Sequence, residues 1–155
     1  MVEIYNEKVT DLLDLTRRNL KLRENRNKGV FIEHVTERYI SRTEEGYQLL
    51  AYGLENRSVG CTQMNAVSSR SHMLFMISLV SNDFSTGEAK SARLTVIDLA
   101  GSEKISKTGT EGKQLSEAIK INTSLSALGN VIHSLSEGKG GHVPYRDSKL
   151  TRLLQ

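Results

Sequence analysis

Large aromatic side chains are scarce in this sequence of 155 residues, which contains no tryptophan, 3 phenylalanines and 5 tyrosines. Few large side chains are therefore available to build a hydrophobic core. The single cysteine, Cys61, excludes an internal disulfide framework and favours a reducing compartment. No run of about 18 apolar residues occurs, so we expect no membrane span. The N-terminus lacks the basic start and apolar middle of a signal peptide.

The remaining composition is that of a soluble globular protein, with 37% hydrophobic and 25% charged residues. The formal net charge of +3 fits an acidic partner but also fits many ordinary enzymes. A chain of this length usually forms one domain, so residues 1–155 are interpreted as a single unit. Because the sequence opens in a strand pattern and closes in a helix pattern, we expect this domain to be incomplete at both ends.

Hydrophobic periodicity predicts a sheet combined with helices. Short strands are predicted from alternating apolar residues around 2–4, 20–22 and 30–34. Two nearly continuous apolar runs, 73–80 and 94–99, predict central strands that are buried on both faces. The polar stretch 81–91 between them, which contains Gly87, predicts a hairpin.

Three helices are predicted, separated by two long polar loops at 56–72 and 101–112. The spacing of Ser41 and Glu44 is that of a capping box and predicts the start of the first helix. The expected apolar face of this helix comprises Tyr47, Leu50, Ala51 and Leu54. The expected apolar stripe of the second helix comprises Leu125, Leu128, Ile132 and Leu135, and glycines at 138–141 end it. The third helix begins near Asp147 and presents Leu150, Leu153 and Leu154.

The two loops carry side chains suited to a nucleotide and its metal ion. Asp98, at the end of a predicted buried strand, is followed three residues later by Gly101. In nucleotide hydrolases such a carboxylate holds the water shell of Mg²⁺, and such a glycine amide bonds the γ-phosphate. The alternative is a plain turn in which Asp98 caps the next segment, and for this short motif alone the turn is favoured.

The segment 65–72 reads N-A-V-S-S-R-S-H. Adjacent hydroxyls can ligate Mg²⁺ and bond a phosphate oxygen, and the Arg70 guanidinium can pair with a carboxylate through a planar fork. The alternative is a polar loop that enters a strand.

A third group of residues could bind an acidic surface. Arg146, Lys149 and Arg152 recur at every third position, which would place them on one helical face. A solvated charged face is the alternative. The four histidines lack metal-ligand spacing, and Cys61 has no activating neighbour in sequence, so we assign no chemistry to them.

Taken in order along the chain, these segments resemble the motor domain of the kinesin superfamily. Residues 65–72 are similar to the first switch of the family, and D-L-A-G-S-E at 98–103 is similar to the second. Residues 121–130 resemble the start of the relay helix, and 142–155 resemble the microtubule-facing segment. The opening E-I-Y-N-E at 3–7 is also typical, so the resemblance covers essentially the whole chain.

The resemblance implies a partial kinesin-type P-loop NTPase fold of the α/β class, with a mixed central sheet flanked by helices. It implies ATP and Mg²⁺ as cofactors and the acidic surface of the microtubule as partner, in the cytoplasm on the cytoskeleton. No nucleic-acid partner is implied, and a homodimer would form through segments outside this chain.

The resemblance also implies roles for single residues. Asn65 would contribute to the nucleotide site, Ser68 would bond the γ-phosphate, and Ser69 would complete the coordination of Mg²⁺. Asp98 would hold a water bound to Mg²⁺, and Gly101 would sense the γ-phosphate through its amide.

Further implied roles concern coupling and filament binding. Arg70 and Glu103 would form a salt bridge that closes around ATP, and Asn122 would help to couple the second switch to the relay helix. The residues implied to face the microtubule are Lys104, His142, Tyr145, Arg146, Lys149 and Arg152.

The sequence contains no G-x-x-x-x-G-K-S/T segment. In kinesins this phosphate loop lies upstream of the position that matches residue 1, and a last strand, a last helix and a linker follow the position that matches residue 155. A sheet that lacks several strands exposes apolar faces and open edges. We therefore expect the chain alone to fold poorly and not to bind ATP tightly.

Three interpretations follow from the resemblance. The first is a microtubule-stimulated ATPase represented by a fragment, the second a non-catalytic module that binds microtubules, and the third a chain without independent function. The first is favoured because the residues proposed for catalysis occur together: Ser69, Arg70, Asp98, Gly101 and Glu103. It requires the loops that carry Ser69 and Asp98 to converge on one magnesium–triphosphate.

Overall fold

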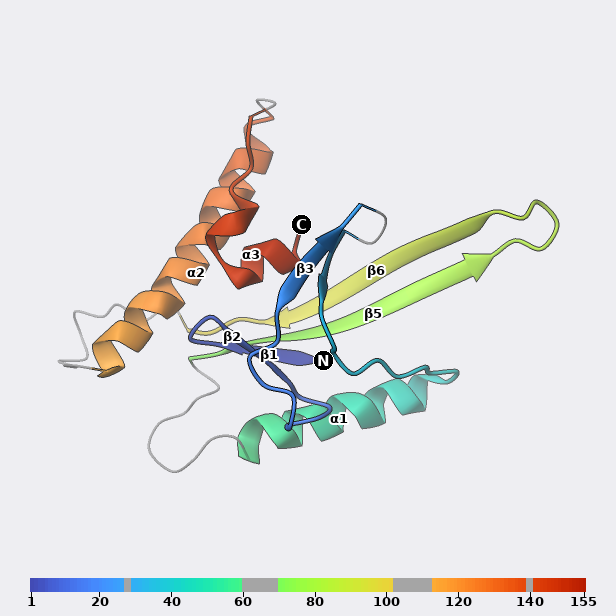
Figure 1. Cartoon of the computed structure of the whole chain (residues 1–155), viewed down its shortest axis with the longest axis horizontal. Coiled ribbons are helices and arrows are strands. Elements are labelled where there is room, and N and C mark those ends of the chain that lie inside the picture. Colours follow the sequence, from blue (N-terminus) through green and yellow to red (C-terminus); the bar gives the residue numbers. More distant parts are fainter. Residues whose placement is uncertain (27–28, 60–69, 102–112, 139–140) are drawn as a thin grey trace.

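The computed structural model describes residues 1–26, 29–59, 70–101, 113–138 and 141–155. Its elements are β1 (Val2–Tyr5), β2 (Lys8–Asp11), β3 (Leu22–Asn25), β4 (Gly29–Ile32), α1 (Thr43–Val59), β5 (His72–Asn82), β6 (Ala89–Asp98), α2 (Lys113–Ser136), the 3-10 helix η3 (Tyr145–Asp147) and α3 (Lys149–Leu153) (Figure 1). The predicted strands and helices are present. The sequence analysis missed β2, which contains a single aliphatic residue, Val9.

Four strands form one sheet in the order β2-β1-β5-β6, and each neighbouring pair is antiparallel. Strands β3 and β4 form a separate antiparallel pair. The turn between β1 and β2 consists of Asn6 and Glu7, whose φ angles are 53° and 58°. Positive φ at both central residues is the geometry of a type I′ turn, which matches the twist of a tight hairpin.

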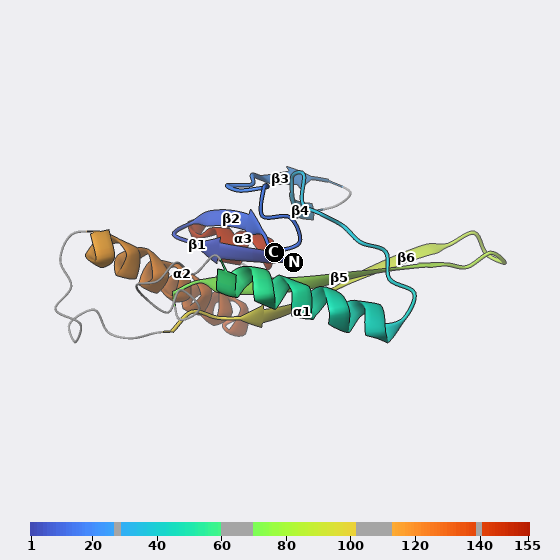
Figure 2. The ribbon, with the colours of Figure 1, turned by 90° about the horizontal axis from the view of Figure 1, so that it is seen from below.

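Helices cover both faces of the sheet, as the predicted fold class requires. Neighbouring side chains of a strand point to opposite faces. On one face Leu74 packs with Val2 and Ile4 beneath α3 and the β3–β4 pair. On the other face Met73 packs near Leu50 of α1. Accordingly, α1 lies on one side of the strands and α2 and α3 lie on the other (Figures 1 and 2).

Strands β5 and β6 form a long hairpin, which confirms the predicted connection. The pairing runs from Met73 opposite Asp98 to Asn82 opposite Ala89. In the turn, hydrogen bonds from Ser85 and Thr86 lower the pKa of the Asp83 carboxyl to about 2.

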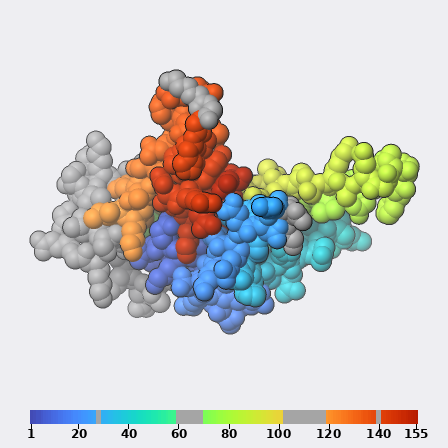
Figure 3. Space-filling view, turned by 45° about the horizontal axis from the view of Figure 1, so that its top comes forward, coloured from blue at the N-terminus to red at the C-terminus, as the bar shows by residue number. Residues whose placement is uncertain are grey.

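The expectation that both strands of this hairpin are buried on both faces is wrong for the half of β5 nearest the turn and for β6. Leu79 and Val80 of β5 are exposed, and so are Leu94 and Val96 of β6. Strand β1 pairs with β5 only from His72 to Leu74, and the end of the hairpin near its turn extends beyond α1 (Figures 1 and 3).

The predicted apolar face of α1 is largely wrong. Leu50 is half-buried, but Tyr47, Ala51 and Leu54 are exposed. The side that packs on the sheet instead carries Gly53, at a point where a Cβ atom would overlap the Met1 side chain. The helix begins at Thr43, and the Ser41 amide donates to the Glu45 carboxylate at 2.8 Å rather than to Glu44.

The predicted stripe of α2 is displaced around the helix. Its buried residues are Ile121, Ser124, Ala127 and Val131. Leu125 and Leu128 are half-buried, whereas Ile132 and Leu135 are exposed. Small side chains at the contact let the helix approach its neighbours closely, and a pattern based on the largest apolar residues does not detect that face.

Helix α3 starts where the sequence predicted and has a reciprocal cap. The Ser148 hydroxyl accepts a hydrogen bond from the Thr151 amide at 3.1 Å, and the Ser148 amide donates to the Thr151 hydroxyl at 3.2 Å. Leu150 and Leu153 are buried in the main core. No helix in the described part of the chain is long and apolar enough to cross a membrane.

The exposed hairpin leads to a prediction about the isolated chain. We expect it to self-associate and to unfold without a sharp transition, because apolar side chains of the hairpin, including Phe84 at 97% exposure, face water. Light scattering against concentration and thermal unfolding by circular dichroism measure both properties.

Replacing Leu79 and Leu94 by threonine should reduce this self-association, since threonine keeps the strand preference and removes apolar area. Ser78→Thr, at an exposed position of the same strand, is the matched control and should change little. A monodisperse chain with a cooperative melt would contradict the expectation.

Candidate functional site

A buried guanidinium, that of Arg57 near the end of α1, connects the ends of several strands. Its side chain is 6% exposed. Nη1 donates to Oδ2 of Asp98 at 2.6 Å, and Nη2 donates to the backbone carbonyl of Ser71 at 3.0 Å and to its hydroxyl at 3.3 Å. Nε lies 3.7 Å from Oε1 of Glu3, which also accepts a hydrogen bond from the Ser71 hydroxyl at 2.6 Å.

This arrangement satisfies a charge that would otherwise be costly to bury. Two carboxylates compensate the guanidinium, and a carbonyl and a hydroxyl accept further hydrogen bonds. Ser71 immediately precedes β5, and Asp98 ends β6. One side chain therefore holds the end of the first predicted loop beside the start of the second.

A buried imidazole, that of His72, lies next to this group and is 3% exposed. The amide of Ala100 donates to Nδ1 at 3.1 Å, so Nδ1 is an acceptor and the proton of the neutral ring is on Nε2. Nε2 lies 2.7 Å from the Ser124 hydroxyl, which in turn donates to the carbonyl of Ile121 at 2.7 Å. The hydrogen bonds thus run from the end of β6 through the ring to α2.

The surroundings keep this ring neutral. Burial lowers the pKa of His72, the positive charge of Arg57 lowers it further, and the Asp98 carboxylate opposes both effects. Because this pKa is lower in the folded than in the unfolded protein, stability is lost as the pH falls below about 6.5.

The structure describes some of the residues that were predicted for the nucleotide site, but not others. Asp98 has a side chain that is 59% exposed, and Gly101 follows it as a half-buried residue. Arg70 is half-buried in the turn before β5. The predicted residues that lie outside the described residues are Asn65, Ser68, Ser69, Glu103 and Lys104. Asn122 is half-buried on α2.

The described part of the site suits an indirect magnesium ligand. The Asp98 carboxylate combines an ion pair to Arg57 with a largely solvent-exposed surface. A carboxylate oxygen is a hard ligand of the kind Mg²⁺ prefers, and exposure leaves room for a bridging water. Asp98 therefore fits its predicted role through water.

The predicted basic face is not one continuous helical face. Arg146 belongs to η3, and the extended backbone of Ser148 separates it from α3, which carries Lys149 and Arg152. Arg146 is largely exposed and lies 3.3 Å from the Glu24 carboxylate. Lys149 and Arg152 are half-buried, and near them His142 is exposed and Tyr145 half-buried.

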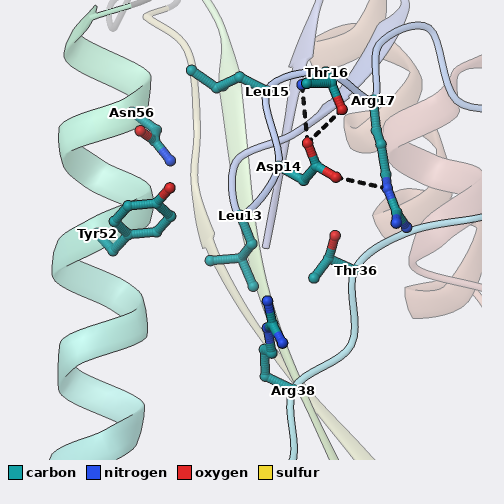
Figure 4. A pocket seen from close by; sticks show the side chains of 9 residues that line it. All are labelled: Leu13, Asp14, Leu15, Thr16, Arg17, Thr36, Arg38, Tyr52 and Asn56. Carbon is teal, nitrogen blue, oxygen red and sulfur yellow. Dashed lines mark hydrogen bonds and ion pairs between the residues drawn. The ribbon is translucent and has the colours of Figure 1, made fainter.

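A surface pocket of about 360 Å³ lies between α1 and the loop after β2 (Figure 4). Its lining residues are Leu13, Asp14, Leu15, Thr16, Arg17, Thr36, Arg38, Tyr52 and Asn56. The Asp14 carboxylate accepts hydrogen bonds from Thr16 and lies 2.8 Å from Nε of Arg17. The pocket contains none of the predicted nucleotide residues, and we assign it no role.

Sequence reasoning missed Arg57, His72 and Ser124. Arg57 gave no signal because basic residues are common in the last turn of a helix. His72 was missed because the histidines were considered only as metal ligands, for which their spacing is wrong. The available signal was His72 itself, a polar residue at the head of an otherwise apolar strand, which must find hydrogen-bond partners when it is buried.

Comparisons with known proteins assign the chain to one protein family. The kinesin motor domain family model matches residues 1–155. Kinesin-related protein 3 of Dictyostelium discoideum is 51% identical over 154 residues, which are 99% of this chain and 13% of that protein. Kinesin-like protein KIN-1 of Arabidopsis thaliana is 52% identical over 158 residues, covering all of this chain and 34% of that protein.

A solved structure described as that of a fast kinesin superposes with a TM-score of 0.87 and 51% identity, covering 99% of this chain and 44% of the other. The fold is thus of the P-loop NTPase type found in nucleotide-driven motors, as the sequence predicted. The chain belongs to the kinesin motor domain family. It spans less than half the length of these relatives.

The burial of Arg57 leads to a stability prediction for a motor domain that carries residues 1–155. Arg57→Met keeps similar volume but leaves the Glu3 and Asp98 carboxylates without their cation. We expect it to lower the free energy of unfolding by about 3 kcal/mol. Urea unfolding followed by circular dichroism measures the change.

Arg93→Met is the matched control, because Arg93 is exposed and its guanidinium donates a hydrogen bond to the Val30 carbonyl at 3.1 Å. Its loss should cost less than about 1 kcal/mol. Equal destabilisation by the two substitutions would show that Arg57 has no special structural role.

Proposed function

We propose that residues 1–155 form part of a microtubule-based motor that couples ATP hydrolysis to microtubule binding and movement. The main support is the guanidinium of Arg57, which contacts both Ser71 and Asp98. Ser71 is two residues from Ser69, and Asp98 opens the second switch-like segment. This shared contact favours the convergence of the two segments on one nucleotide.

In this proposal the two segments bind ATP and Mg²⁺ from one side. Asn65 and Ser68 would contact the nucleotide, and Ser69 and a water on Asp98 would complete the coordination of Mg²⁺. The amide of Gly101 would bond the γ-phosphate. The phosphate loop comes from a part of the motor outside residues 1–155, and its strand pairs with β6, whose second edge is open in the described sheet.

The same segments close and open with the state of the nucleotide. A salt bridge between Arg70 and Glu103 would close the site around ATP, and loss of the γ-phosphate contact after hydrolysis would let it relax. Helix α2, with Asn122 near its middle, carries the displacement to η3 and α3, against which α2 packs.

The proposed filament surface consists of Lys104, His142, Tyr145, Arg146, Lys149 and Arg152. Exposure of Arg146 and His142 favours this assignment. Cationic side chains would bind the acidic surface of the microtubule, so we expect the protein to function on the cytoskeleton in the cytoplasm.

A second candidate function is a module that binds microtubules without hydrolysing ATP. It would apply if the whole protein lacks the phosphate-loop motif, which residues 1–155 do not contain. The coding sequence upstream of residue 1 distinguishes the candidates, since an in-frame G-x-x-x-x-G-K-S/T supports the motor.

The nucleotide role of Gly101 can be tested in the motor domain with its natural flanking sequence. Gly101→Ala should lower the microtubule-stimulated ATPase rate by about 100-fold, because the added methyl group separates the amide from the γ-phosphate. Gly87→Asn is the control, as asparagine tolerates the φ of 72° at this hairpin turn, and it should retain the rate within about twofold. An unaffected Gly101→Ala variant would remove the proposed sensor.

The filament surface can be tested by co-sedimentation with microtubules over a range of salt concentrations. Arg146→Ala and Lys149→Ala should each weaken binding by about fivefold, which corresponds to about 1 kcal/mol for an exposed ion pair. Arg42→Ala, at an exposed position before α1, is the control. Equal loss in all three variants would indicate attraction by net charge alone.

A further inference from the structure

Helix α2 is hydrogen-bonded to the sheet at the imidazole of His72. The ring is fixed on β5, at a residue that also pairs with Ile4 of β1. One ring nitrogen accepts the Ala100 amide and the other faces the Ser124 hydroxyl. Elsewhere α2 packs mainly against η3 and α3, so this polar contact joins the helix directly to the strands.

We infer that His72 and Ser124 are positioning residues, which transmit movement at the end of β6 to α2. This inference rests on the proposed function. Ala100 directly precedes Gly101, the proposed sensor of the γ-phosphate, so its amide moves when Gly101 moves. Because the imidazole ring is rigid, a displacement at Nδ1 also reorients the bond that Nε2 makes to Ser124.

Burial makes this contact specific. His72 and Ser124 are each 3% exposed, so water does not readily replace either hydrogen bond. The Ser124 hydroxyl has a second partner in its own helix, the Ile121 carbonyl. Its orientation is therefore fixed relative to α2, and the ring is fixed relative to β5.

The test is Ser124→Ala in the complete motor domain, because alanine keeps the helix intact and removes only the hydroxyl. The matched control is Thr123→Ala. The Thr123 hydroxyl donates to a carbonyl of the same helix, that of Ile119, at 2.8 Å, but Thr123 is exposed, whereas Ser124 is the residue that contacts His72. Both substitutions thus remove a helix-bound hydroxyl, and only one removes the contact to the sheet.

We expect Ser124→Ala to keep the basal ATPase rate within about twofold and to lower the microtubule-stimulated rate by about tenfold. The ratio of microtubule affinities with an ATP analogue and with ADP should fall by a similar factor, about tenfold. The ¹⁵N chemical shift of Nε2 of His72 should change in this variant alone. Thr123→Ala should retain all of these properties.

Two results would overturn the inference while leaving the proposed function intact. One is a Ser124→Ala variant with full microtubule stimulation and a full difference between nucleotide states. The other is an equal loss in Thr123→Ala, which would indicate a general effect on the helix. If the unaltered motor domain shows no microtubule-stimulated ATPase, the proposed function is wrong, and the inference falls with it.

Discussion

The structure depends on the compensation of one buried positive charge. A guanidinium withdrawn from water is destabilising unless carboxylates and other acceptors surround it, and the partners of Arg57 come from three strands or their ends. Glu3 lies on β1, Ser71 precedes β5, and Asp98 ends β6. To satisfy the charge, the chain must bring these points together, and this fixes the end of the first switch-like segment beside the start of the second.

His72 extends this polar centre toward α2 without adding a charge. Burial of the ring and the positive charge of Arg57 both lower the pKa of His72 and so favour the neutral imidazole, which accepts a hydrogen bond on one side and donates on the other. Movement of the charged group and movement of α2 are therefore linked through a single ring. The hydrogen bonds provide a physical route from the proposed nucleotide site to the helices that carry the filament surface.

The exposed apolar side chains of the β5–β6 hairpin contrast with this charge-compensated centre. Both strands of the hairpin have the composition of central strands, yet Leu79 and Val96 are exposed in this chain. The prediction of burial was wrong because it assumed neighbours on both faces. The open edge of β6 is where a further strand would remove apolar area from water, in agreement with the proposal that a larger motor domain completes the sheet.

Local pattern alone determined much of this fold. Alternation predicted β1 and β4, the Gly87 region predicted the hairpin, and the leucine spacing after Asp147 predicted α3, since each depends on neighbours in sequence. The switch-like motifs also indicated the family correctly. The convergence of Ser69 and Asp98 stays a prediction, because Ser69 lies outside the described residues.

Only the tertiary structure decided which helix faces are buried and which polar residues form the centre. The partners of Arg57 include Asp98, 41 positions away, and His72 lies 52 positions from Ser124. Periodicity selects the largest apolar residues of a helix, whereas packing selected small ones such as Ala127, where close approach is possible. Contacts between distant segments depend on how the strands and helices assemble, and no local pattern encodes them.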